Sequence, residues 1–333
     1  MRIEFSGLVD IQVNGFGGVD FNSPDVSADR IREILPALRA TGVTRFLPTL
    51  ITGSLDRFAT CARTINAVDD PAIAGIHMEG PYISPNDGPR GAHPRAHAID
   101  ASLDDLRRRQ DAAAGRIVLV TLAPEIPGAL AMIEYLADRG IRVALGHSEA
   151  SPEIIRDAIR AGATLSTHLG NGCAAMLPRH PNLIWEQLAA DELYASFIVD
   201  GHHLPPSTVK VAVRAKSPQR TILTTDAMAA AGCPPGSYRI GDADVDVGAD
   251  RRVSLRGTPY LAGSALTMAE SVVNTVRFTG MPMDDVLPMA STVPATYTGI
   301  ELDGTVSADW NPERLELQII DVVSNARGAH TSC

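Results

Sequence analysis

The sequence has few cysteines, no long basic cluster and no long apolar run, and each shortage argues against a class of protein. Its four cysteines, Cys61, Cys173, Cys233 and Cys333, show no CxxC or paired spacing, which argues against a disulfide framework or a thiolate metal site. The formal net charge is −10, so neither nucleic acid nor an anionic membrane is expected as a partner. No stretch approaches the ~18 apolar residues of a membrane span, and the amino terminus lacks a secretory signal pattern. We therefore expect a soluble, cytoplasmic protein with a small-molecule partner.

Short apolar segments alternate along the chain with segments of helical periodicity. The expected strands are Gly7–Val13, Thr44–Leu50, Ile73–Glu79, Ile117–Leu122, Arg142–Gly146, Thr164–His168, Ala195–Asp200 and Thr221–Asp226. The expected helices include Ala28–Thr41, Leu103–Ala114, Pro127–Arg139, Pro152–Ala161 and Pro206–Ala215. This alternation predicts an α/β fold of the closed (β/α)8 TIM-barrel type rather than an open doubly wound sheet. The first strand is also not followed by the GxGxxG turn of a dinucleotide-binding fold.

The chain leaves this alternation after Asp226. Gly- and Pro-rich turns with short alternating strands predict a β-hairpin excursion around residues 235–262, before a helical stretch over Leu266–Thr279. A loop of this length usually serves a site. We assign residues 1–306 to the barrel and 307–333 to a carboxyl-terminal tail, in which ERLELQIIDVV predicts a single strand with no obvious partner.

Four polar residues stand at or just beyond the ends of expected strands: Glu79 in HMEGP, His147 in GHS, His168 in THLGN and Asp226 in TTDA. In a (β/α)8 barrel these ends meet at one face, which carries the chemistry. One carboxylate and two imidazoles suit a catalytic zinc ion, and Asp226 is placed to accept and return a proton. A lone histidine here is more often structural, and a lone aspartate is often a helix cap. Four such residues at one rim favour a metal-dependent hydrolase.

Segments in the same order along most of the chain resemble the N-acetylglucosamine-6-phosphate deacetylases of the amidohydrolase superfamily. They include GLVDIQVNGFGGVDF, FLPTLIT, GIHMEGPYIS, GHSEAS, STHLGNG, VDGHH, TTDA and LAGSALTM. The resemblance places the metal ligands at Glu79, His147 and His168 and the general acid/base at Asp226, the residues already chosen from the strand ends. It also implies a homodimer.

The resemblance further implies how a substrate is held. His93 would polarise the acetamide carbonyl, and Arg179 and His203 would bind a phosphate group, since a guanidinium fork and an imidazole suit phosphate oxygens. The other implied substrate contacts are Ala92, Asn171, Gly172, Leu261, Ala262 and Gly263.

Gln12 and Asn14 stand where many amidohydrolases carry the two histidines of a second metal site. Neutral amides are poor zinc ligands beside imidazole. We therefore expect one divalent metal ion per chain, with zinc preferred and iron as the alternative.

Three segments depart from the pattern of the resembled family. The loop Gly170–Cys173 is small and glycine-rich, and Trp185 and His180 change the surroundings of Arg179. The first barrel strand begins at Gly7, so we expect the accessory β-sandwich of such enzymes to be reduced or missing.

The leading hypothesis is a metal-dependent amide hydrolase that removes acetate from N-acetylglucosamine 6-phosphate. One alternative is a deacetylase of another N-acetylhexosamine or of an N-acyl amino acid. A second alternative is a non-catalytic binding barrel, against which the intact set Glu79, His147, His168 and Asp226 argues.

Overall fold

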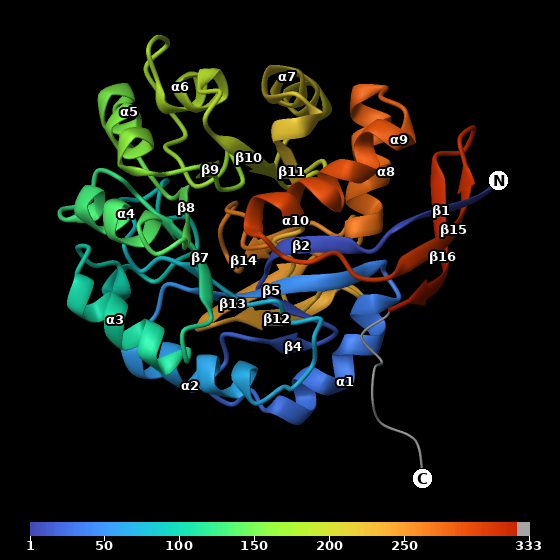
Figure 1. The fold of residues 1–333 in the computed structure, drawn as a ribbon, viewed down its shortest axis with the longest axis horizontal. Helices are drawn as coiled ribbons and strands as arrows, with labels where there is room; N and C mark the ends of the chain where they lie inside the picture. The colour runs from blue at the N-terminus through green and yellow to red at the C-terminus, as the bar shows by residue number, and fades with distance from the viewer. Residues whose placement is uncertain (325–333) are drawn as a thin grey trace.

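The centre of the molecule is an eight-stranded parallel sheet that curves into a barrel, with neighbouring strands in chain order (Figure 1). The computed structural model describes residues 1–324, so the end of the predicted tail, including Cys333, lies outside the described residues. The strands are β2 (Leu8–Val13), β5 (Val43–Ile51), β6 (Ile76–Glu79), β7 (Ile117–Leu122), β8 (Arg142–Leu145), β9 (Leu165–Ser166), β10 (Tyr194–Phe197) and β11 (Thr221–Leu223). The predicted TIM-barrel architecture is confirmed.

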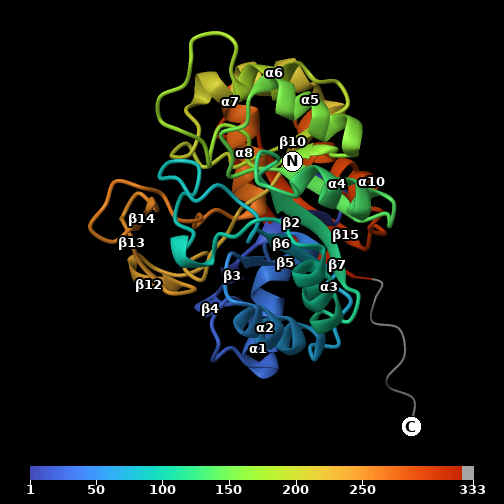
Figure 2. The same ribbon diagram turned by 90° about the vertical axis from the view of Figure 1, so that its left-hand side faces the viewer.

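Helices follow the strands and surround the sheet (Figures 1 and 2). Their starts are set locally: the Ser27 and Ser151 side chains accept hydrogen bonds from backbone amides of the first turns of α1 and α5, and Thr267 forms a capping box with Glu270 at α8. The helices are α1 (Ala28–Arg39), α2 (Leu55–Asn66), α3 (Leu103–Ala112), α4 (Ala129–Ala137), α5 (Pro152–Ala161), α6 (Leu183–Ala189), α7 (Pro206–Lys216), α8 (Met268–Thr279), α9 (Met283–Val286) and α10 (Thr292–Thr298), with 3-10 turns at Arg95–His97, Pro218–Arg220 and Leu287–Ala290.

The barrel closes between its last and first strands through one backbone bridge and side-chain hydrogen bonds rather than through a continuous ladder. A single parallel bridge joins Val13 to Ala227. Beside it, the buried carboxylate of Asp10 accepts hydrogen bonds from the hydroxyl groups of Thr224 and Thr225, at 2.8 and 2.5 Å. Burial raises the pKa of Asp10 to about 6, although these hydrogen bonds act in the opposite direction. The contact between the last and first barrel strands, called the barrel seam below, therefore includes the buried carboxyl group of Asp10.

The interior of the barrel is apolar at the amino-terminal ends of its strands. Side chains from several strands, including Val9, Leu47, Leu119 and Ile222, pack together there with Tyr297 of α10. These positions precede the polar residues at the strand ends. Helix α10 therefore covers one end of the barrel and leaves the other end for the site.

The strands at the site end are shorter than the sequence suggested. We expected strands through Gly146, His168 and Asp226, but β8, β9 and β11 end one to three residues earlier. The reason is backbone conformation: φ is 53° at His147, 30° at His168 and 50° at Asp226. The left-handed region is unfavourable for residues with a side chain, and such strain is typical of functional sites.

The excursion expected around residues 235–262 is an antiparallel sheet of three strands, β12 (Gly236–Ile240), β13 (Ala243–Val247) and β14 (Val253–Leu255). It stands to one side of the barrel (Figure 2). The backbone amide of Gly241 donates to Asp20 at 2.7 Å, and Arg57 pairs with Asp242 at 2.6 Å. Asp20 ends the short strand β4 (Val19–Asp20), which pairs with β3 (Gly15–Phe16). The sheet is thus fixed to the first part of the barrel.

The prediction of one unpaired strand in the tail was wrong. Two strands, β15 (Thr305–Asn311) and β16 (Glu316–Val323), form a hairpin, and β15 also pairs with the amino-terminal strand β1 (Arg2–Ser6). The predicted boundary at residue 306 falls inside β15. A partner some 300 residues away leaves no local signal in the sequence. Within the described part of the chain, this three-stranded sheet lies outside the barrel, and no β-sandwich is formed.

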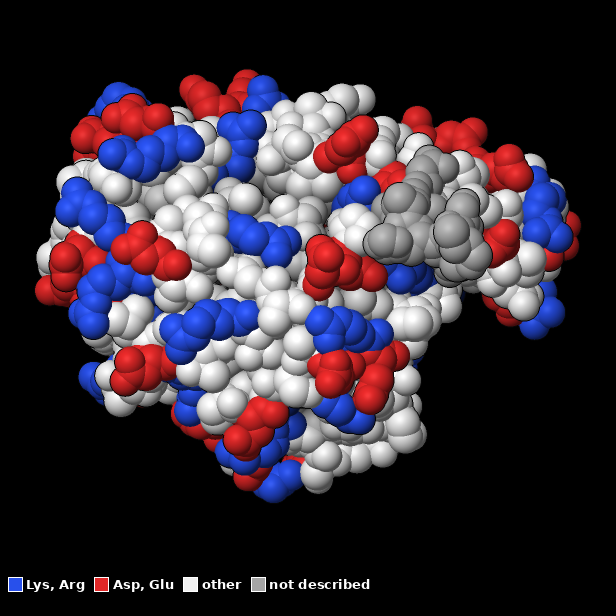
Figure 3. Space-filling view, turned by 60° about the horizontal axis from the view of Figure 1, so that its bottom comes forward, with Lys and Arg blue, Asp and Glu red and all other residues white. Residues whose placement is uncertain are grey.

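The surface shown in Figure 3 carries acidic and basic side chains side by side, without a continuous patch of either sign. Among the described residues, no helix is both long and apolar enough to cross a membrane.

Candidate active site

The carboxyl ends of the barrel strands open into a cavity of about 690 Å³, called the site cavity below. Residues at or just after the strands form its inner wall. The loops after β6 and β9, the turn between β13 and β14 and the segment after β14 form its outer wall. The predicted residues that line it are Glu79, Ala92, His93, His147, His168, Asn171, Gly172, His203, Asp226, Leu261 and Gly263. The structure thus brings together residues that are far apart in the sequence.

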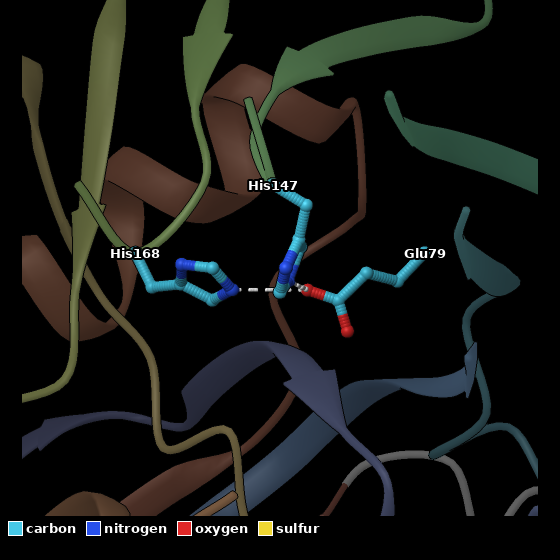
Figure 4. Close-up of side chains that lie close together, drawn as sticks. All are labelled: Glu79, His147 and His168. Carbon is cyan, nitrogen blue, oxygen red and sulfur yellow. Dashed lines mark hydrogen bonds and ion pairs between the residues drawn. The ribbon is translucent and has the colours of Figure 1, made fainter. Parts of the chain in front are cut away.

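Glu79, His147 and His168 converge at the bottom of this cavity (Figure 4). The Nε2 atoms of His147 and His168 lie 3.2 and 3.0 Å from the same oxygen, Oε1 of Glu79. One ligand atom from each residue lies within 4.8 Å of the other two, and all three residues are buried. Burial alone would raise the pKa of Glu79, but the hydrogen bonds from the two histidines outweigh it and hold the pKa well below its usual value.

The surroundings of the two histidines prepare them to bind a metal ion. Nδ1 of His147 donates to the carbonyl oxygen of Pro89 at 2.9 Å, so Nε2 is the ring atom that would bind a metal ion in place of its hydrogen bond to Glu79. The backbone amide of His168 donates to Oγ of Ser196 at 2.8 Å and so fixes the turn after β9. A buried carboxylate with two buried imidazoles fits a divalent ion such as zinc, with room for a further ligand.

Asp226 faces this cluster and is held by two amide side chains. Nδ2 of Asn14 and Nε2 of Gln12 donate to its Oδ1 at 2.6 and 3.1 Å, and Gln12 also donates to Oε1 of Glu79 at 2.8 Å. Burial, together with the negative charge of Glu79, raises the pKa of Asp226 to about 6. A carboxyl group with such a pKa can accept and release a proton near neutral pH, as a general acid/base must.

His93 is the third imidazole at the cluster. Its ring centroid lies 4.2 Å from that of His147, and its Nε2 lies 3.8 Å from Oε2 of Glu79. Burial, assisted by the charge of His147, lowers the pKa of His93 to about 3, so the ring is neutral at physiological pH. A neutral imidazole carries one proton, and its effect depends on which nitrogen holds that proton.

The hydroxyl group of Thr52 is placed to determine which ring nitrogen of His93 carries the proton. Its Oγ1 lies 2.8 Å from Nδ1 of His93. When the hydroxyl group donates to Nδ1, the ring proton sits on Nε2, which faces the metal-binding cluster. Thr52 was not among the predicted site residues, although it directly follows β5. The search for polar residues at the ends of apolar runs, which identified the metal ligands, could also have identified Thr52.

His203 has a fixed orientation. Its Nδ1 donates to Oδ2 of Asp200 at 2.6 Å, and the backbone amides of His202 and His203 both donate to Oδ1 of Asp200 at 2.8 Å. Burial would raise the pKa of Asp200, but the hydrogen bond from His203 lowers it below its usual value. The carboxylate therefore stays charged, and Nε2 of His203 is left for a ligand.

Gly172, which lines the cavity, lies close to His147. Its φ is 57°, and a Cβ there would come within 3.0 Å of Nδ1 of the histidine ring.

Two of the predicted substrate residues, Ala262 and Arg179, do not line the cavity. Ala262 packs in a buried apolar cluster with Met228. Arg179 is exposed and is absent from the cavity lining. Its proposed contact with phosphate stays a prediction.

Comparison with known proteins agrees with the geometry. Residues 5–308 match the amidohydrolase family. The N-acetylglucosamine-6-phosphate deacetylase of Vibrio furnissii is 33% identical over 300 residues, covering 89% of this chain and 73% of that protein. The N-acetylgalactosamine-6-phosphate deacetylase of a Shewanella species is 34% identical over 315 residues, covering 92% and 77%.

The solved structures point in the same direction. A mutant N-acetyl-D-glucosamine-6-phosphate deacetylase of Mycobacterium smegmatis, in complex with N-acetyl-D-glucosamine-6-phosphate, superposes with a TM-score of 0.87 at 32% identity, covering 97% of this chain and 86% of that one. The Pasteurella multocida deacetylase superposes with a TM-score of 0.86 at 28% identity, covering 97% and 86%. The chain thus belongs to the amidohydrolase family and, within it, to the N-acetylglucosamine-6-phosphate deacetylases.

Proposed function

We propose that this protein removes acetate from N-acetylglucosamine 6-phosphate and releases glucosamine 6-phosphate. The observation that carries the proposal is the position of Asp226, a buried carboxyl group that faces the cluster of Glu79, His147 and His168 at the base of a cavity large enough for a sugar. The names of the relatives, which are deacetylases of amino-sugar phosphates, support this substrate class.

The chain's own residues can divide the reaction between them. A divalent ion held by Glu79, His147 and His168 would polarise a carbonyl group and make water a better nucleophile at neutral pH. Asp226 would accept a proton from the attacking water and then donate it to the departing amine. His93, neutral and with its proton on Nε2, would donate a hydrogen bond to the acetamide oxygen, where negative charge develops.

We further propose that each chain binds one divalent metal ion, that the protein is a homodimer and that it is cytoplasmic. Gln12 and Asn14, whose amide nitrogens donate to the two carboxylates, support one ion per chain, because neutral amides are poor zinc ligands beside imidazole. Zinc suits the donor set, with iron as the alternative. The described cysteines Cys61, Cys173 and Cys233 are free thiols, which supports a cytoplasmic location. The homodimer rests on the family resemblance.

A second candidate is the epimeric substrate, N-acetylgalactosamine 6-phosphate. The Shewanella relative named for that activity is as similar to this chain as the glucosamine enzymes are. The two sugars differ only in the orientation of one hydroxyl group, while the acetamide and the phosphate are shared. Both candidates therefore use the same metal cluster and acid/base.

A substrate panel with metal-analysed protein tests the proposal. We expect about one tightly bound divalent ion per chain and release of acetate from N-acetylglucosamine 6-phosphate at a higher kcat/KM than from N-acetylgalactosamine 6-phosphate, N-acetylglucosamine or N-acetylated amino acids. A preference for an N-acetylated amino acid would refute the substrate class. Two ions, both required for turnover, would refute the single-ion mechanism.

A further inference from the structure

Below the cluster of Glu79, His147 and His168, a row of buried polar side chains crosses the interior of the barrel. This row, called the polar row below, consists of Thr49, His77, Thr121 and Thr167, which are all at most 3% exposed. Two residues before each threonine lies a leucine of the apolar end of the barrel: Leu47, Leu119 or Leu165. Inward-facing positions recur every two residues along a strand. The polar row therefore lies between the apolar interior and the cluster.

Hydrogen bonds join the polar row from end to end. Nδ1 of His77 lies 3.3 Å from Oγ1 of Thr49, and its Nε2 lies 2.8 Å from Oγ1 of Thr121. Oγ1 of Thr121 lies 2.7 Å from Oγ1 of Thr167. At the other end, the backbone amide of Val13 donates to Oγ1 of Thr49 at 3.1 Å. The polar row thus connects β2, β5, β6, β7 and the turn after β9.

The direction of these hydrogen bonds follows from Thr49. Its hydroxyl group donates to the carbonyl oxygen of Leu47 at 3.2 Å, so its oxygen is left to accept from Nδ1 of His77. A charged ring would be costly here, because His77 is buried and its hydrogen-bond partners are neutral hydroxyl groups. The neutral ring carries its proton on Nδ1, and Nε2 accepts from Thr121. Thr121 in turn accepts from Thr167.

A glycine makes the contact between Thr121 and Thr167 possible. Strand β8 lies between β7 and β9 in the sheet, so the two side chains have to meet across it. Gly146 follows β8 at this point, and a Cβ there would lie 2.8 Å from Cγ2 of Thr121 and 3.0 Å from Cβ of Thr167. Because glycine has no Cβ, the two hydroxyl groups come within hydrogen-bonding distance.

The polar row touches the chain beside every member of the cluster. His77 lies two residues before the glutamate on β6, and Gly146 and Thr167 directly precede the two histidines. Val13 lies between the two amide side chains that donate to Asp226. Groups that hold the backbone on either side of a metal site determine how well its ligand atoms converge on one ion. The polar row is placed to do this for the whole cluster.

We propose that His77 is a positioning residue: as the centre of the polar row, it sets the spacing of the three cluster residues and thereby the affinity of the site for its divalent ion. The proposal rests on the proposed function, which requires that ion. It gives a role to a histidine that belongs neither to the cluster nor to the cavity lining. A row that only stabilised the fold would leave the metal affinity of the folded site unchanged.

Variants of Thr121 test the proposal with little change in shape. Thr121→Val removes the hydroxyl group between His77 and Thr167, and we expect the zinc dissociation constant, measured by competition with a chelator, to rise about 10-fold. Thr121→Ser keeps the hydroxyl group and should restore most of the affinity. Thr275→Val is the matched control, since it removes a buried hydroxyl group that donates to Ser271 within α8. The control should lower stability without changing zinc affinity.

His77→Leu removes both hydrogen bonds of the ring and should weaken zinc binding by more than Thr121→Val does. The double variant should bind zinc no more weakly than His77→Leu alone, because both changes act through the same row. Additive losses would overturn the proposal. Should His77→Leu fail to fold, the two Thr121 variants and their control decide.

Nitrogen NMR of the His77 ring gives a readout that needs neither metal nor substrate. We expect the proton on Nδ1 in the wild-type protein, and a changed chemical shift of Nε2 in Thr121→Val, where that nitrogen loses its donor. A proton on Nε2 would overturn the proposal, as would wild-type zinc affinity in Thr121→Val or an equal loss of affinity in Thr275→Val. If the wild-type protein binds zinc but hydrolyses no acetylated sugar, the deacetylase function fails, and the affinity measurements still decide the role of His77.

Discussion

The base and the outer wall of the site cavity are built differently. Glu79, His147, His168 and Asp226 at the base lie at the ends of barrel strands or two to three residues beyond them, and each is hydrogen-bonded to other buried groups. The outer wall consists of loops, including the turn before β14 that carries Arg252 and the segment after β14 that carries Leu261. A strand end can be located from an apolar run, whereas the position of a loop depends on contacts that the sequence does not display. Chemistry is therefore easier to predict than substrate preference.

The largest expected effect is at the base. Asp226→Asn keeps the shape of the side chain but removes its ability to carry a proton, so we expect kcat to fall about 10²- to 10⁴-fold while the metal content stays unchanged. His168→Ala is the comparison variant and should lose both metal and activity. Elemental analysis and steady-state kinetics on both variants measure this. Near-normal turnover of the asparagine variant would mean that another group transfers the proton.

A smaller effect, on the pH dependence of stability, is expected from Asp10 in the barrel seam below the site. Burial raises the pKa of Asp10 from 3.8 to about 6, so the folded state holds this proton more tightly than the unfolded chain. Wild-type stability should therefore fall relative to Asp10→Asn as the pH rises from about 4 through 6, by about 3 kcal/mol in total. Asparagine retains an acceptor oxygen but does not titrate. Denaturant unfolding of both proteins at pH 4, 5, 6 and 7 measures the difference.

Parallel stability curves for these two proteins would show that Asp10 has an ordinary pKa in the folded state. A constant offset between the curves is expected in addition, since the amide cannot reproduce every hydrogen bond from Thr224 and Thr225.

The smallest expected effect is on kcat and concerns the hydrogen bond between Thr52 and His93. Thr52→Val removes the hydroxyl group beside Nδ1 of His93 with little change in shape, and should lower kcat about 10-fold through loss of the required tautomer. Thr52→Ser should restore most of the activity. Nitrogen NMR of the His93 ring gives a readout independent of turnover. A serine variant as slow as the valine variant would show that Thr52 acts through packing.

The barrel and the base of the site could be predicted from the sequence because both follow from local patterns. Apolar runs located the strands, and the polar residue after each run located Glu79, His147, His168 and Asp226. The same rule applied to β5 would also have identified Thr52. Strand ends were misplaced because His168 and Asp226 adopt left-handed backbone conformations that a hydropathy pattern does not reveal.

The features that were missed depend on distant partners. Arg252 lies in a turn of the small sheet. The neighbouring residues Arg251 and Asp250 hold this turn against Glu270 of α8 and against His202, contacts that have no signature in the local sequence. The tail strand β15 pairs with β1, some 300 residues earlier. The phosphate contact that the resemblance implies for Arg179 stays a prediction, and the segment around this residue departs from the family pattern.

The pairing of β1 with β15 also has a consequence for the time course of synthesis. At about 5–20 residues per second, a ribosome takes roughly 15–60 s to add the ~300 residues that separate these strands. During that interval β1 has no native partner and exposes an unpaired edge, which is a hazard for association with other chains. Arg2 and Glu4 lie within this strand, and Arg2 later pairs with Asp309. Charged side chains on an edge strand disfavour pairing with other chains, so we expect Arg2 and Glu4 to protect the nascent chain during this interval.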